Sequence, residues 1–166
     1  MVLNVAGCNK ESIVDGIGIR YTVFVQGCPH NCLGCHNPET HPFGVGTDLE
    51  LERICTDISR NPLLDGVTYS GGEPMCFTTE LIQLSQMLRD RMGTDFNIWC
   101  YTGYIYEDLI KKADKLELLR LIDILVDGAY DISQRDLTLR FRGSLNQRVI
   151  DVQKSLHEHR VIELDI

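Results

Sequence analysis

The sequence predicts an α/β fold, in the form of an open, partial β/α barrel with a mainly parallel sheet. Runs of β-branched and aromatic residues alternate with amphipathic stretches along the chain, as in repeated β–α–β units. A complete eight-stranded barrel of such units takes about 250 residues. Because this chain has 166 residues, it can form only part of a barrel, and we expect residues 1–166 to form a single domain.

The first two strands are expected near the N-terminus. Residues 2–6 are a short apolar run, which we interpret as an edge strand. Two glycines around Ile17 indicate a turn. Residues 21–25 are β-branched and aromatic, which predicts a buried strand that ends at Gly27, directly before a cysteine-rich loop.

The middle of the chain predicts two helices around a strand. After a loop, Asp48 and the acidic residues behind it are typical of a helix N-terminus, and we expect this helix to run to about residue 60. Residues 66–70 have the composition of a strand. Thr78 or Thr79 then begins an amphipathic helix whose inward apolar side chains are Leu81, Ile82, Leu84 and Leu88.

Two further strands are predicted at residues 97–101 and 122–126. A helical stretch from about residue 106 to residue 121 connects them, with a break near Asp114. Residues 137–141 alternate between apolar and polar side chains, which predicts one more strand. This alternation of strands and helices is the basis of the parallel-sheet prediction.

The composition narrows the class of protein. A hydrophobic share of 43% and a charged share of 24% are typical of a globular protein. The formal net charge of −8 argues against binding to nucleic-acid phosphates. No apolar run approaches the ~18 residues of a membrane helix, and the N-terminus lacks the pattern of a signal peptide. We therefore expect a cytoplasmic protein that binds neither nucleic acid nor membrane.

Three of the seven cysteines form a cluster with the spacing C-x3-C-x2-C. The thiolates of Cys28, Cys32 and Cys35 can converge on one metal centre. A closed zinc site and a bacterial ferredoxin motif both need a fourth ligand, which this spacing does not supply. The pattern therefore favours a cluster with one open iron, where a small molecule can bind, and structural zinc is the alternative.

The remaining cysteines are interpreted as buried apolar side chains rather than as a disulfide framework, because no signal peptide is evident. They are Cys8, Cys55, Cys76 and Cys100.

Each motif of chemical interest follows the end of a predicted strand. In chain order these are the cysteine loop and the residues at 71–74, 102–103 and 127–128. Ligands of parallel α/β folds bind at the carboxyl ends of the strands. We therefore expect all four motifs to face one pocket.

The Gly71-Gly72-Glu73-Pro74 turn frees the backbone for close approach to a ligand and places a carboxylate beside it, although an isolated motif of this kind is usually a plain strand-to-helix turn. Thr102 and Gly103 follow the end of the next predicted strand, and Asp127 follows the strand after that, where it is either a ligand-binding residue or a turn aspartate before Gly128.

The cysteine loop resembles that of the radical S-adenosylmethionine enzymes, and residues 71–73 resemble the GGE motif of that family. The resemblance implies a partial barrel of the radical S-adenosylmethionine type and a [4Fe-4S] cluster on the three cysteines, with S-adenosylmethionine on the fourth iron. It also implies reductive cleavage of the sulfonium to a 5'-deoxyadenosyl radical. Gly71, Gly72 and Glu73 would bind the methionyl amino group. Thr102 and Gly103 would reach the nucleoside, and Asp127 would bind a ribose hydroxyl or an ammonium group.

Residues 14–20 and 35–39 look like the corresponding segments of glycyl-radical-enzyme activases. Residues 125–128 and 135–151 are similar to the activating proteins of anaerobic ribonucleoside-triphosphate reductases. This resemblance implies that the partner is the large, glycyl-radical subunit of such a reductase. It also implies a low-potential electron donor, such as flavodoxin or ferredoxin.

Several features depart from the family pattern or leave alternatives open. Gly34 stands where many relatives have an aromatic residue against the adenine, so other groups must hold the base; Gly34, Cys35 and His36 remain candidate cofactor contacts. His36 packs on the cluster or adenine, or is an ordinary loop histidine. His30 is expected at the surface.

Three functional alternatives remain. The stretch at residues 35–37 is closer to the pyruvate formate-lyase activase. A small-molecule radical enzyme such as the deazaguanine synthase is another alternative. The third is a non-catalytic zinc or electron-transfer module, with His30 or His36 as the fourth ligand.

A basic island on this acidic chain is interpreted either as a solvated face or as a carboxylate clamp or docking surface. If the predicted strand at residues 137–141 continues through Arg142, then Arg140 and Arg142 lie on the same face of it. The arginines are Arg135, Arg140, Arg142 and Arg148.

Overall fold

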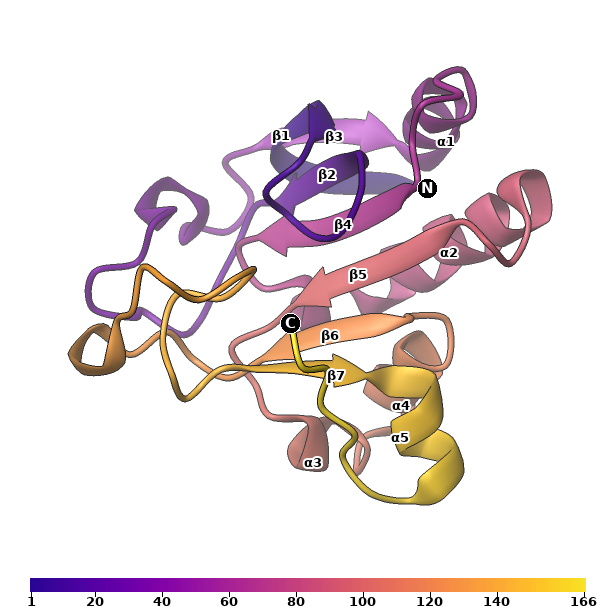
Figure 1. The fold of residues 1–166 in the computed structure, drawn as a ribbon. Helices are drawn as coiled ribbons and strands as arrows, with labels where there is room; N and C mark the ends of the chain where they lie inside the picture. The colour runs from indigo at the N-terminus through magenta and orange to yellow at the C-terminus, as the bar shows by residue number, and fades with distance from the viewer.

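A seven-stranded sheet organises the fold, and the computed structural model describes residues 1–166. Its four central strands are parallel: β2 (Arg20–Val25), β4 (Gly66–Gly71), β5 (Asn97–Tyr101) and β6 (Ile124–Asp127). Antiparallel strands flank them: β1 (Val2–Ser12) and β3 (Thr47–Glu50) on one side and β7 (Arg148–Asp151) on the other. The strand order is β3-β1-β2-β4-β5-β6-β7, so β3 and β7 form the two edges of an open sheet (Figure 1).

The predicted α/β class is confirmed, as is an open sheet with a parallel centre. The sheet as a whole is mixed, because both flanks pair in the antiparallel sense.

Helices pack on one face of this sheet (Figure 1). Five of them are α-helical: α1 (Leu51–Ser59), α2 (Thr78–Met92), α3 (Tyr106–Leu109), α4 (Ala113–Leu119) and α5 (Val152–Glu158). Three short 3-10 helices are η1 (Pro38–Thr40), η2 (Pro74–Cys76) and η3 (Ile132–Gln134). The break predicted near Asp114 lies just before it, between α3 and α4.

Side-chain alternation along β5 separates two cores. Ile98 and Cys100 belong to the main core between the sheet and the helices, which also contains Leu81, Leu84 and Leu88 of α2. Trp99 points to the opposite face, into a small cluster with Val126 and Val149. The C-terminal residues Leu164 and Ile166 and the loop residue Phe141 pack against this second cluster.

The expected helix cap at Asp48 is wrong. Asp48 lies in β3, where its Oδ1 accepts a hydrogen bond from Asn4 Nδ2 of β1 (2.7 Å). Helix α1 starts at Leu51 behind Glu50, whose side chain makes no capping hydrogen bond. Strand pairing with β1 therefore overrides the local capping signal.

Two smaller expectations also change. The strand predicted at residues 2–6 extends to Ser12 and is not at an edge, because β3 pairs with it from Val2 to Val5. At the start of α2, Phe77 occupies the N-cap position, and Thr78 Oγ1 instead donates to Asp114 Oδ2 (2.9 Å).

The strand predicted at residues 137–141 is absent. Asp136 Oδ1 accepts from the backbone N–H (2.8 Å) and hydroxyl of Thr138, which is the geometry of a turn. Phe141 has a left-handed backbone (φ 62°) and packs edge-on against Trp99, with a ring distance of 5.2 Å. Strand β7 and helix α5, which the sequence did not predict, follow this segment.

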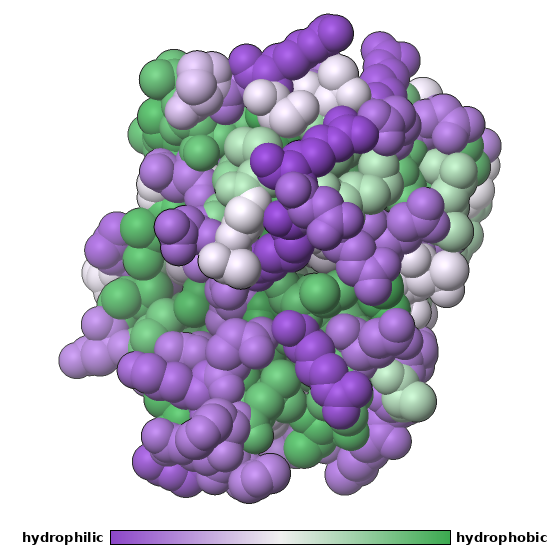
Figure 2. Space-filling model, turned by 90° about the vertical axis from the view of Figure 1, so that its right-hand side faces the viewer, coloured by the Kyte–Doolittle hydropathy of each residue, from purple (hydrophilic) through white to green (hydrophobic).

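Figure 2 shows the face at the amino ends of the parallel strands, where hydrophilic side chains surround smaller hydrophobic areas. None of the helices combines the length and the apolar character that a bilayer span requires.

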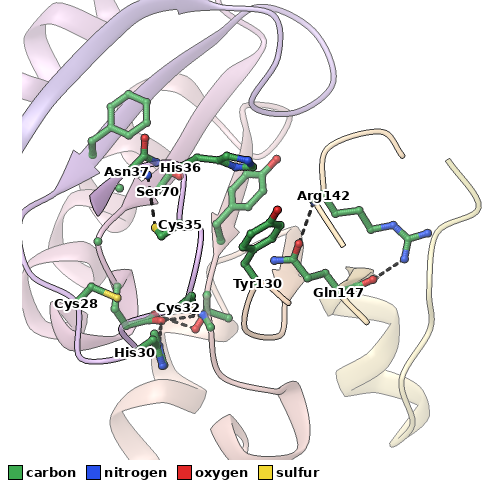
Figure 3. A pocket seen from close by; sticks show the side chains of 18 of the residues that line it. Cys28, His30, Cys32, Cys35, His36, Asn37, Ser70, Tyr130, Arg142 and Gln147 are labelled. Atoms are coloured by element: carbon green, nitrogen blue, oxygen red, sulfur yellow. Dashed lines mark hydrogen bonds and ion pairs between the residues drawn. The ribbon is translucent and has the colours of Figure 1, made fainter. Parts of the chain in front are cut away.

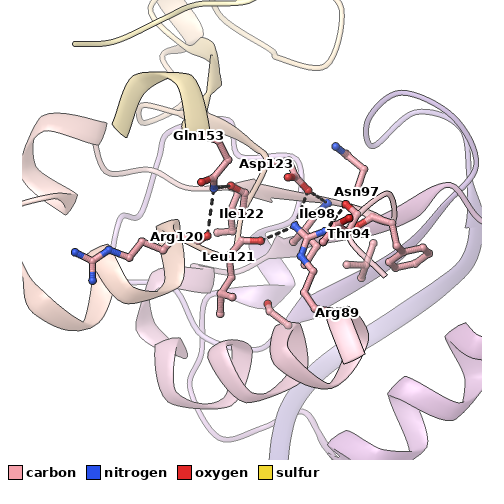
Figure 4. A network of polar contacts seen from close by, with 12 residues as sticks. Arg89, Thr94, Asn97, Ile98, Arg120, Leu121, Ile122, Asp123 and Gln153 are labelled. Carbon is pink, nitrogen blue, oxygen red and sulfur yellow. Dashed lines mark hydrogen bonds and ion pairs between the residues drawn. The ribbon is translucent and has the colours of Figure 1, made fainter. Parts of the chain in front are cut away.

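Arg89 of α2 ties the amino ends of two strands together (Figure 4). Its guanidinium donates to the carbonyls of Thr94, Phe96 and Leu121 (3.1, 2.6 and 2.9 Å) and to Asp123 Oδ2 (2.8 Å). Asp123 Oδ2 also accepts from the Ile98 N–H (2.7 Å). One cation therefore neutralises Asp123 and pairs carbonyls that the sheet leaves free.

We predict that Arg89→Met lowers the free energy of unfolding by about 2–4 kcal/mol, because it leaves partly buried carbonyls and the Asp123 carboxylate without a donor. Urea denaturation measures the change. Arg91→Met, on the same helix, removes an exposed pair with Glu52 and a long, exposed contact to the hydroxyl of Thr56 (3.4 Å), and serves as the control with little effect. Equal stability of the two variants would contradict the prediction.

Candidate metal and cofactor site

A cavity of about 610 Å³ opens at the carboxyl ends of the central strands. Figure 3 shows the cysteine loop on one side of it and residues 128–147 on the other. Eight of the expected site residues line it together: Cys28, Cys32, Cys35, His36, Gly71, Gly72, Glu73 and Thr102. Parallel strands thus bring together motifs that are far apart in the sequence.

The cysteine loop is anchored by the backbone. The N–H groups of Gly27 and Cys28 donate to the carbonyls of Thr40 (2.8 Å) and His41 (3.0 Å). Gly27 has φ +139°, and a Cβ there would clash with the ring of Phe43. Inside the loop, the Asn37 N–H points at Cys35 Sγ (3.4 Å), as a donor to a sulfur ligand would.

The three thiols of this loop are free, and burial raises the pKa of Cys28 to about 11. No three His, Cys, Asp or Glu side chains converge closely enough to form a ready-made ion site. The donor set itself, three thiols of one loop that face one cavity, fits the ligand chemistry of iron–sulfur clusters.

The other cysteines only partly follow the expectation of burial. Cys55 and Cys100 are buried, and Cys8 is half-buried. Cys76 is exposed, because it ends the short helix η2 after the glycine turn.

The carboxylate of Glu73 is completely buried and accepts four hydrogen bonds. Oε1 accepts from the N–H of Met75 (2.9 Å) and the hydroxyl of Thr102 (2.8 Å). Oε2 accepts from the N–H of Gly103 (2.8 Å) and lies 2.5 Å from Nε2 of His30. Glu73 therefore joins the cysteine loop to the loops that follow β4 and β5.

His30 is not the surface residue expected from the sequence. Its side chain is 16% exposed, and its ring packs edge-on against Tyr104 at 4.5 Å. No local pattern around His30 indicates this contact, because Glu73 lies 43 positions away in the sequence.

Gly71 and Gly72 are required by packing. Gly71 has φ +94°, and a Cβ there would lie 2.6 Å from the Cα of Phe24. A Cβ at Gly72 would clash with the backbone of Gly27, whose carbonyl accepts from the Glu73 N–H (2.8 Å). The turn therefore lies directly against the start of the cysteine loop.

Residues 128–147 form the wall opposite the cysteines. Tyr130 lies beside His36, with a ring distance of 5.1 Å. Gln147 Oε1 accepts from the Gly143 N–H (2.9 Å), and its carbonyl accepts from Arg142. No local sequence pattern marks Tyr130 or Gln147 as site residues, since both reach the cavity from an irregular segment.

Gly34 does not line the cavity. It has φ +74°, and a Cβ there would lie 2.6 Å from Cδ1 of Ile132. The position that is aromatic in many radical S-adenosylmethionine enzymes is therefore a left-handed glycine here, and the end of the Ile132 side chain lies where its Cβ would be.

Asp127 also lies outside the cavity lining, and it is completely buried. Its carboxylate accepts from Arg148 Nε (3.0 Å) and Nη2 (2.5 Å) and from the Tyr106 N–H (2.8 Å). Arg148 also binds Glu107 (2.7 and 3.0 Å) and holds the pKa of that carboxyl below its usual value. Asp127 thus has no free oxygen for a ribose or an ammonium group.

Comparisons with known proteins agree with the cluster chemistry. Residues 14–150 match the family described as a 4Fe-4S single cluster domain. The chain is 35% identical over 141 residues to the anaerobic ribonucleoside-triphosphate reductase-activating protein of Haemophilus influenzae, with 81% of this chain and 89% of that protein covered. The protein of the same name from Escherichia coli K12 is 35% identical over 144 residues, with 82% and 91% covered. That of phage T4 is 33% identical over 141 residues, with 82% and 86% covered.

We predict that Asp127→Asn lowers the free energy of unfolding by about 2–4 kcal/mol, because Arg148 loses its buried counter-charge. In a titration with S-adenosylmethionine the variant should behave as the wild type does, since Asp127 lies outside the cavity lining. Denaturant titration and a binding titration on the reconstituted protein measure the two quantities.

Asp108→Asn is the matched control, since Asp108 forms only an exposed pair with Lys111. If Asp127→Asn instead weakened S-adenosylmethionine binding without loss of stability, Asp127 would be a ligand.

Proposed function

Since this chain belongs to the family of anaerobic ribonucleoside-triphosphate reductase-activating proteins, we propose that it generates the glycyl radical of such a reductase, through S-adenosylmethionine and a [4Fe-4S] cluster. The observation that carries the proposal is the meeting of the three cysteines with the Gly71–Glu73 turn in one cavity. Neither motif alone distinguishes this function from a metal-binding module.

Cys28, Cys32 and Cys35 would hold the cluster and leave one iron for S-adenosylmethionine. When bound, the two groups supply the chemistry, a one-electron cleavage of the sulfonium that leads to removal of a hydrogen atom from a glycine of the partner. The protein contributes position and exclusion of water. The Asn37 N–H supports this assignment, because an amide aimed at a ligand sulfur tunes the cluster electrostatically.

The rest of the cavity wall would bind S-adenosylmethionine. The turn at Gly71 and Gly72 presents its backbone to the methionyl end, and Glu73 acts by holding this turn and Thr102 in place. His36 and Tyr130 provide aromatic faces for the adenine, which compensates for the missing aromatic side chain at Gly34.

The open sheet agrees with a partial barrel of the radical S-adenosylmethionine type. The edge strands β3 and β7 do not pair with each other, so the sheet does not close into a barrel. An open sheet leaves room for a macromolecular substrate to reach the cavity. We propose that the large reductase subunit presents its glycine there, and that a low-potential flavodoxin or ferredoxin reduces the cluster in the cytoplasm.

Cluster binding gives the first prediction for this function. After anoxic reconstitution and reduction with dithionite, the protein should give a [4Fe-4S] electron paramagnetic resonance signal that changes when S-adenosylmethionine is added. Cys32→Ala should lose most of the iron and the signal. Cys76→Ala, which removes an exposed cysteine outside the loop, should keep both. One tightly bound zinc and no cluster signal would refute the proposal.

Partner choice gives the second prediction. The reduced protein with S-adenosylmethionine should produce a glycyl-radical doublet on an anaerobic ribonucleotide reductase and none on a pyruvate formate-lyase under the same conditions. Radical formation on the lyase alone would assign the chain to the other group of activases.

A further inference from the structure

His30 has no place in the chemistry described above, although it lies in the middle of the cysteine loop. It is separated by one residue from Cys32 and by one from Cys28. Figure 3 shows its imidazole near Cys32, next to several of the dashed polar contacts. Its Nε2 lies 2.5 Å from Glu73 Oε2, and the contact spans 43 positions of the sequence.

The surrounding residues pack closely around the imidazole of His30. A Cβ at Gly103 would lie 2.5 Å from Cδ2 and 2.6 Å from Nε2 of His30. The N–H of Gly103 donates to the same carboxylate oxygen that His30 contacts (2.8 Å). Tyr104 closes the other side of the imidazole through an edge-on contact at 4.5 Å. The imidazole is therefore held by its ring and by its nitrogen.

Glu73 connects this contact to the glycine turn. The carboxylate reaches the Met75 N–H directly behind the turn, and the Glu73 N–H is bonded to the carbonyl of Gly27 at the start of the cysteine loop (2.8 Å). The turn is thus linked to the loop twice, through Gly27 at its beginning and through His30 near its middle. A loop fixed at two points has fewer conformations than a loop fixed only at its beginning.

We propose that His30 is a positioning residue, which holds the cluster-binding loop in register with the Gly71–Gly72 turn. This rests on the proposed function, in which the loop carries the cluster and the turn receives the methionyl end of S-adenosylmethionine. Because the cofactor must contact both, its affinity depends on their relative position. Loss of the His30–Glu73 contact therefore weakens cofactor binding while the three thiols remain available to the cluster.

A pair of amide substitutions tests the contact. The amide of His30→Gln reaches the position of Nε2 and can donate to Glu73, whereas the amide of His30→Asn is one methylene shorter and cannot. Both variants are polar and uncharged. His30→Phe keeps the ring against Tyr104 and removes the donor. His157→Asn, at an exposed position of α5, controls for loss of a histidine.

The measurements are iron content, the electron paramagnetic resonance signal of the reduced cluster, and the concentration of S-adenosylmethionine that half-converts this signal. His30→Asn and His30→Phe should keep iron close to the wild-type content and weaken the affinity about tenfold, as expected for one lost charge-assisted hydrogen bond. His30→Gln should recover the affinity to within about threefold.

The possible failures differ. Wild-type affinity in His30→Asn and His30→Phe would overturn the positioning role and leave the proposed function intact. Loss of iron from His30→Asn, His30→Phe and His30→Gln alike would also overturn it, since His30 would then be a ligand or a folding requirement. A wild-type protein whose signal does not respond to S-adenosylmethionine would overturn the proposed function itself.

Discussion

The buried carboxylate of Glu73 is the interaction on which the site depends. A buried charge costs several kcal/mol unless donors surround it. Here four donors come from three segments: the cysteine loop, the turn after β4 and the loop after β5. Each segment needs the others to be in place, because withdrawal of any donor leaves the charge under-compensated. The pocket at the strand ends is therefore a cooperative unit.

The two ends of the parallel sheet are fastened by residues of opposite charge. At the amino ends of β5 and β6, Arg89 donates hydrogen bonds to carbonyl oxygens that strand pairing leaves without a donor. At the carboxyl ends of β4 and β5, Glu73 accepts hydrogen bonds from backbone N–H groups. A cation suits free acceptors and an anion suits free donors, so each charge matches the backbone groups that its end of the sheet offers.

The arginines near the C-terminus do not form a single basic surface. Arg148 is engaged by Glu107 and Asp127 of its own chain, and the guanidinium of Arg140 lies over the ring of Phe141 at 4.9 Å. Arg142 lines the cavity, and its Nε is buried without a partner. The alternation that grouped them in the sequence has no structural counterpart, because a turn at Asp136 and the left-handed Phe141 interrupt the chain.

The sequence by itself determined the four central strands and the cysteine loop, since these follow from local composition and spacing. It also determined that the motifs lie at one edge of the sheet, because parallel strands end on the same side. Only the tertiary structure decided the role of residues whose partners are distant in the chain. His30 is half-buried and turned inward because it contacts Glu73, Asp127 is closed off because Arg148 pairs with it, and Asp48 lies in a strand because β1 is beside it. Four-residue strands such as β3 and β7 carry too little sequence pattern of their own, and their conformation is set by the strands they pair with.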